Sequence, residues 1–182
     1  MDRFAVLSPF VGVLVGLGVA DLVFSVHRTV RAGRRWHWVP AVWVASVFLV
    51  ALAYWWVFSE IGRSAALGQL PRFVFHLVSP LLLVLTCAAA LPDDGDDRDL
   101  WPYYLANHRY FFALYAAFLF HATLDYGFNY GSWSRATPWF TLGLSTAAAS
   151  LAVVDHEGYH KVMSAVLLAV WIAGLLTFVP TL

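Results

Sequence analysis

Hydrophobic residues in this chain gather into six long stretches separated by short polar segments. A helix needs roughly 20 apolar residues, within about 17 to 25, to cross a hydrocarbon layer of about 30 Å. We identify six such stretches, at about residues 4–26, 38–58, 73–91, 103–125, 139–154 and 161–179. An α-helix satisfies its own backbone polar groups in lipid, whereas an open sheet does not. The pattern therefore predicts a single domain over residues 1–182, a bundle of six transmembrane helices.

The composition agrees with an all-α integral membrane protein. Hydrophobic residues make up 61% of the chain and charged residues only 12%, and the mean hydropathy is +0.70. A soluble domain carries about 25% charged residues, so the surplus apolar side chains are expected to face lipid. Nine Trp and eight Tyr are typical of aromatic belts at the two membrane interfaces. We expect a multi-pass protein of the bacterial inner membrane.

Charge distribution predicts an orientation and limits the partners. Lys and Arg are more frequent in the connections after the first, third and fifth stretches, which have seven, than on the other side, which has four. Since cytoplasmic loops are enriched in these residues, both termini are expected on the outer side. The net charge is zero, which argues against nucleic acid as a partner. The expected partners are the lipid bilayer and either further copies of this chain or a larger membrane complex.

Ionisable residues within the apolar stretches are the main functional candidates, because a charge inside a bilayer is costly unless it is used or paired. Asp21 lies inside the first stretch, and a second group gathers toward the outer side: Glu60, His76, His121 and Asp125. His121 and Asp125 are four residues apart, so they share one helix face. His76 and His121 are expected at matching depth on antiparallel helices. These five residues form the predicted pathway for an ion or a proton.

The stretch "VVDHEGYHKV" contains the zinc-hydrolase pattern H-E-x-x-H at His156, Glu157 and His160, with His108 as a candidate third ligand. A zinc site needs both histidines on one helical turn, so that their nitrogens converge on the metal. Two membrane spans between about residues 138 and 180 leave only a short connection, and its turn-forming residues are Asp155 and Gly158. The length therefore favours a hairpin turn here, which would separate the two histidines.

The sequence supports ion, proton or small-solute conduction, transport or sensing through membrane-embedded Asp and His residues, and no enzyme activity is assigned. Three alternatives remain open. One is a membrane-embedded metal-dependent hydrolase that holds zinc at the HEGYH stretch. Another is a protein that binds haem b between His76 and His121, and the third is an accessory membrane subunit without chemistry of its own. No family resemblance assigns the chain further.

Overall fold

The computed structural model describes the backbone of residues 3–61, 69–92, 99–130, 133 and 136–178, and the side chains of these residues except 3–7, 59–61, 129–130, 136–137, 171 and 174–178. The described residues form six α-helices and no strand. The helices are α1 (Arg3–Arg31), α2 (Trp38–Ile61), α3 (Leu70–Ala89), α4 (Leu100–Tyr130), α5 (Ala136–Val153) and α6 (Glu157–Phe178).

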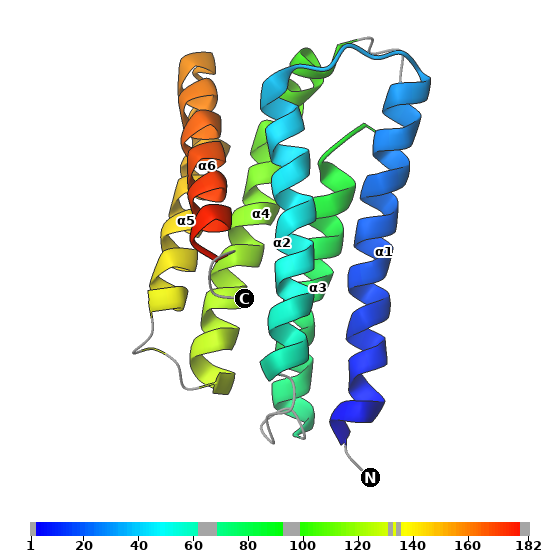
Figure 1. Cartoon of the computed structure of the whole chain (residues 1–182), viewed down its shortest axis with the longest axis vertical. Helices are drawn as coiled ribbons and strands as arrows, with labels where there is room; N and C mark the ends of the chain where they lie inside the picture. The colour runs from blue at the N-terminus through cyan, green and yellow to red at the C-terminus, as the bar shows by residue number, and fades with distance from the viewer. Residues whose placement is uncertain (1–2, 62–68, 93–98, 131–132, 134–135, 179–182) are drawn as a thin grey trace.

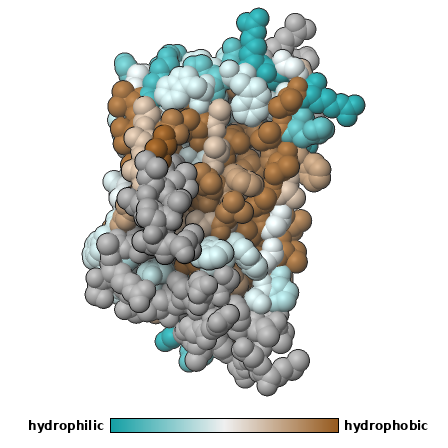
Figure 2. Space-filling model, in the orientation of Figure 1, coloured by the Kyte–Doolittle hydropathy of each residue, from teal (hydrophilic) through white to brown (hydrophobic). Residues whose placement is uncertain are grey.

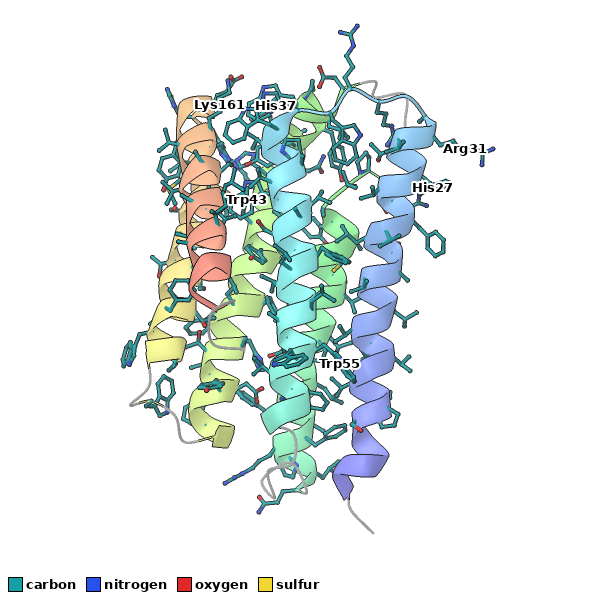
Figure 3. All side chains as sticks on the ribbon, viewed as in Figure 1. His27, Arg31, His37, Trp43, Trp55 and Lys161 are labelled. Atoms are coloured by element: carbon teal, nitrogen blue, oxygen red, sulfur yellow. The ribbon has the colours of Figure 1, made fainter. Side chains whose placement is uncertain are left out.

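Consecutive helices run in opposite directions, so the chain forms an up-and-down bundle (Figure 1). The most extensive packing is that of α4 against α5, followed by α3 against α4 and α1 against α3. Helix α2 crosses the front of the bundle and contacts α1, α3, α4 and α6. A buried hydrogen bond of 2.8 Å from Trp43 Nε1 on α2 to Ser164 Oγ ties α6 to this face (Figure 3).

Two glycines explain local features of the backbone. Gly33 has a φ of +63°, a conformation that residues with a Cβ rarely adopt, and it is the second residue after the end of α1. Gly18 lies where α1 crosses α3, and a Cβ at this position would be 3.2 Å from Cα of Val84. The small residue therefore allows the close approach of these two helices, as small residues commonly do in membrane bundles.

The apolar exterior of the bundle supports the prediction that this protein is embedded in a membrane. In the part of the chain that the structure describes, four helices are long and apolar enough to cross one, over Ser8–Arg31, Trp38–Phe58, Leu70–Ala89 and Leu100–Phe128, and Pro138–Val153 forms a shorter apolar helix. Figure 2 shows a hydrophobic band around the middle of the molecule, below a hydrophilic upper end.

Hydrophilic residues gather at the upper end of the bundle (Figure 2). His27 and Arg31 point outward from α1 at this end (Figure 3). The Lys161 ammonium lies 5.2 Å from the centre of the Trp101 ring, and the His37 ring packs on the same indole at 4.4 Å. Aromatic rings that pack with cationic and polar groups are typical of a membrane–water boundary.

Candidate functional site

A buried histidine–aspartate pair joins α3 to α4. His76 Nδ1 lies 2.6 Å from Asp125 Oδ2, and the two residues are only 2% and 4% exposed. Because an ionised carboxylate only accepts hydrogen bonds, the imidazole donates from Nδ1. His76 Nε2 lies 3.2 Å from the Tyr54 hydroxyl of α2. Three helices therefore meet at one imidazole, which we call the His76–Asp125 site.

Aromatic rings enclose this imidazole. The Phe58 ring stacks on His76 with centroids 5.1 Å apart, and the Tyr54 ring stacks at 6.2 Å. Such surroundings weaken solvent screening, so a net charge on the pair interacts strongly with neighbouring groups. An opposite charge close to the pair is needed to offset it. When both ring nitrogens of His76 are protonated, the pair with an ionised Asp125 is neutral overall, and when one of these protons is lost the pair carries one negative charge. The site is therefore suited to exchanging a proton for another positive charge.

The His76–Asp125 site borders a cavity of about 200 Å³ between α2, α4 and α5. Its polar lining residues are Tyr54, His76, Asp125, Tyr126 and Thr141, and its other lining residues are apolar. Small-molecule sites commonly combine a mostly apolar wall with a few polar groups. The cavity extends along α2 from Val50 to Phe58, roughly 12 Å at 1.5 Å per residue.

His121 lies one helical turn from Asp125 and makes a different contact. Its Nδ1 is 2.8 Å from Oγ of Ser79, a fully buried residue of α3. Its Nε2 is buried and has no hydrogen-bond partner among the described residues. His76 and His121 therefore do not contact each other. Each makes its own contact between α3 and α4, His76 with Asp125 and His121 with Ser79, and these contacts lie one helical turn apart. The short bond of Asp125 is with His76, across the helix interface, although the sequence spacing favoured His121 as its partner.

Asp21, another residue of the predicted pathway, does not lie at this site. Asp21 is partly buried on α1, and its Oδ2 has no hydrogen-bond partner among the described residues. Asp21 lies one turn beyond Gly18, which packs beside Cys87 of α3. Cys87 is roughly 16 Å along α3 from His76, so Asp21 lies far from the His76–Asp125 site. The side chain of Glu60 lies outside the described residues.

The H-E-x-x-H stretch begins in a turn at His156 and continues into the first turn of α6. Helix α5 ends at Val153 and α6 begins at Glu157, so the hairpin predicted from length is confirmed. The bend lies at residues 154–156, however, and Gly158 is inside α6. The expectation that the turn separates the two histidines is therefore wrong, because the His160 amide donates to the His156 carbonyl oxygen within the first turn of α6. His156 and Glu157 are exposed, and Glu157 pairs with Lys161 at 3.3 Å.

His160 is fully buried, and both of its ring nitrogens are used. Nδ1 lies 2.7 Å from the Tyr104 hydroxyl, and Nε2 lies 2.8 Å from the Val154 carbonyl oxygen. This geometry gives His160 a structural role, because it holds the α5–α6 turn against α4. Over the part of the chain that the structure describes, no three or more His, Cys, Asp or Glu side chains are placed to hold a metal.

His108, the candidate third ligand, belongs to the same end of the bundle. Its Nδ1 lies 2.8 Å from the Leu105 carbonyl oxygen and its Nε2 lies 3.0 Å from Asp155 Oδ1. Arg109 also pairs with this carboxylate through two hydrogen bonds. The guanidinium holds the pKa of Asp155, which lies in the turn, below its ordinary value. These contacts fasten the turn to α4.

Tyr54, Phe58 and Ser79 are the site residues that sequence reasoning missed. Tyr54 and Phe58 belong to the run "YWWVF", which resembles an aromatic belt, and Ser79 is an uncharged residue in an apolar stretch.

Comparison of the chain with known protein families, with curated proteins and with solved structures finds no match. The geometry of the site is therefore the basis for a functional proposal.

Proposed function

We propose that this chain is a membrane protein that transports or senses a proton or a small solute through protonation of the His76–Asp125 site. The observation that carries the proposal is the buried pair itself, which lies on helices able to cross a membrane and borders a cavity. Ionisable pairs inside a membrane are costly, and they commonly mark the path of an ion or a proton. A buried pair with no adjacent cavity would have no room for a solute.

We further propose six membrane spans with both termini on the outer side, in a bacterial inner membrane. Helices α5 and α6, with 18 and 22 residues, are roughly 27 and 33 Å long, close to the thickness of about 30 Å that a span must cover. The cationic residues at the upper end support a cytoplasmic location for that end. They are Arg28, Arg31, Arg34, Arg35, Arg109 and Lys161.

Proton flux into liposomes tests the proposal. The full chain is reconstituted with a pH-sensitive dye inside the vesicles, and an imposed pH gradient is followed at several external pH values. We expect flux above that of empty liposomes, and we expect Asp125→Asn to abolish it, because the amide cannot take part in proton exchange. His156→Asn, an exposed variant in the turn, is the matched control and should retain the wild-type flux.

Two outcomes would contradict the proposal: a wild-type flux equal to that of empty liposomes, or an unchanged flux in Asp125→Asn. The same assay tests the wider pathway predicted from the sequence. If Asp21→Asn and His121→Ala leave the flux unchanged, these two residues are not part of the route.

A further inference from the structure

The wall of the cavity beside the His76–Asp125 site combines aromatic side chains with a single acidic group. Five aromatic residues other than His76 line it: Tyr54, Phe58, Phe118, Tyr126 and Phe140. Among the described residues that line the cavity, Asp125 is the only acidic one and none is Lys or Arg. The carboxylate of Asp125 and the aromatic rings of this wall therefore favour a positive charge in the cavity over a negative one.

Physical chemistry narrows the kind of cation. The faces of aromatic rings attract cations, and groups of such rings recognise quaternary ammonium ions without needing hydrogen bonds. A metal cation instead needs several oxygen, nitrogen or sulfur ligands, and among the described residues no three side chains of His, Cys, Asp or Glu gather to supply them. An anionic ligand would be repelled by the Asp125 carboxylate. An organic cation fits this wall best.

The volume limits the size of the ligand. A cavity of about 150 Å³ holds a benzene molecule, and the present cavity measures about 200 Å³. We propose that it binds a small organic ammonium ion, of the size of a trimethylammonium head or a single-ring amine. This inference rests on the proposed function and names the class of solute that its site accepts.

The pair and the ligand are coupled through charge. Among the described residues, the titratable groups that face the cavity are Tyr54 from α2, His76 from α3, and Asp125 and Tyr126 from α4, while Phe140, Thr141 and Leu144 from α5 are neutral. The ammonium ion supplies the positive charge that the second proton of the His76 ring supplies in its absence. Binding of the cation therefore displaces up to one proton from the His76–Asp125 site, and the affinity rises with pH.

Binding of choline to the full chain in lipid nanodiscs tests the inference, followed by titration calorimetry at two pH values. The matched ligand is 3,3-dimethylbutan-1-ol, which has carbon in place of the charged nitrogen and nearly the same shape. We expect choline to bind about tenfold or more tightly than this alcohol. We also expect proton release on choline binding, visible as a dependence of the measured heat on the buffer.

Two variants test whether choline binds to the residues that line the cavity. Asp125→Asn should weaken choline by about tenfold or more and leave the alcohol unaffected, since only the cation senses the carboxylate. Phe140 is 56% exposed, so Phe140→Leu is expected to fold normally, and it should also weaken choline alone. The leucine variant keeps the test valid if Asp125→Asn fails to fold.

Equal binding of choline and the alcohol, or no binding of choline, would overturn the inference. Competition by sodium ions at the concentration of choline would also overturn it, because it would assign the site to an inorganic cation. If choline does not bind but proton flux still depends on Asp125, the ligand class is wrong and the proposed function stands. If Asp125→Asn changes neither binding nor flux, both are wrong.

Discussion

Replacing Tyr104 by phenylalanine tests whether His160 has the structural role that the geometry gives it. Tyr104 is 6% exposed, and its hydroxyl lies 2.7 Å from Nδ1 of His160. Since Nε2 of this imidazole donates to the Val154 carbonyl oxygen, Nδ1 of the neutral ring accepts from the phenol. Tyr104→Phe preserves the ring and its packing but leaves Nδ1 buried without a donor. That costs about 1–3 kcal/mol.

Thermal unfolding of the full chain in detergent, followed by circular dichroism, measures this loss. For a protein of this size, 1 kcal/mol shifts the Tm by about 2–4 °C, so Tyr104→Phe should lower the Tm by about 2–12 °C. Tyr110 lies on the same helix and is 60% exposed, and Tyr110→Phe is the control that should leave the Tm unchanged. A metal chelator should not change the Tm of the wild-type protein.

Two results would refute the reasoning. An unchanged Tm in Tyr104→Phe would show that the hydroxyl does not satisfy His160. If a chelator lowers the wild-type Tm and Tyr104→Phe leaves it unchanged, then His160 binds a metal and the H-E-x-x-H pattern forms part of a metal site.

Two further predictions concern helix packing and the α5–α6 turn. Gly18→Ala should destabilise the bundle by about 1–3 kcal/mol, because its methyl group would press on the backbone of Val84; Gly16→Ala, which has open space around it, should be neutral or slightly stabilising in the same unfolding assay. Asp155→Asn should cause a small loss of stability at pH 7, since solvent screens its exposed pair with Arg109. The pKa of Asp155 is lowered in the folded protein, so its contribution is present above the ordinary value of 3.8 and is lost as the pH falls through the folded value. The wild-type protein and Asp155→Asn should therefore differ in denaturant midpoint at pH 7 and converge in strong acid.

Hydropathy was sufficient to place the six helices but not their ends. The fourth apolar stretch was expected to end at Asp125, yet α4 continues to Tyr130, so this aspartate lies inside the helix. Similarly, the last helix begins at Glu157, four residues before the apolar stretch does. In both cases the helix is extended by residues that hydropathy assigns to a connection, because backbone hydrogen bonding continues the helix past the apolar stretch.

The candidate site depends on how α3 and α4 pack, and a hydropathy pattern does not contain that information. Matching depths from the helix ends paired His76 with His121. In the structure His76 meets Asp125, one turn away, because side-chain packing sets the register of two antiparallel helices. The contribution of Tyr54 was not predictable for the same reason, since it depends on which face of α2 is turned toward α3.

The two groups of polar residues in this bundle contain similar residue types, but they differ in the volume of the cavity beside them. At the upper end, His108 and His160 have hydrogen-bond partners at both ring nitrogens, and the cavity beside His108 measures only about 10 Å³, no more than one water molecule occupies. Such a network can fix a turn but cannot admit a solute. The His76–Asp125 site has similar residue types beside about 200 Å³. A histidine in this protein therefore supports a functional proposal when room for a solute lies beside it, and a structural one when its surroundings are closed.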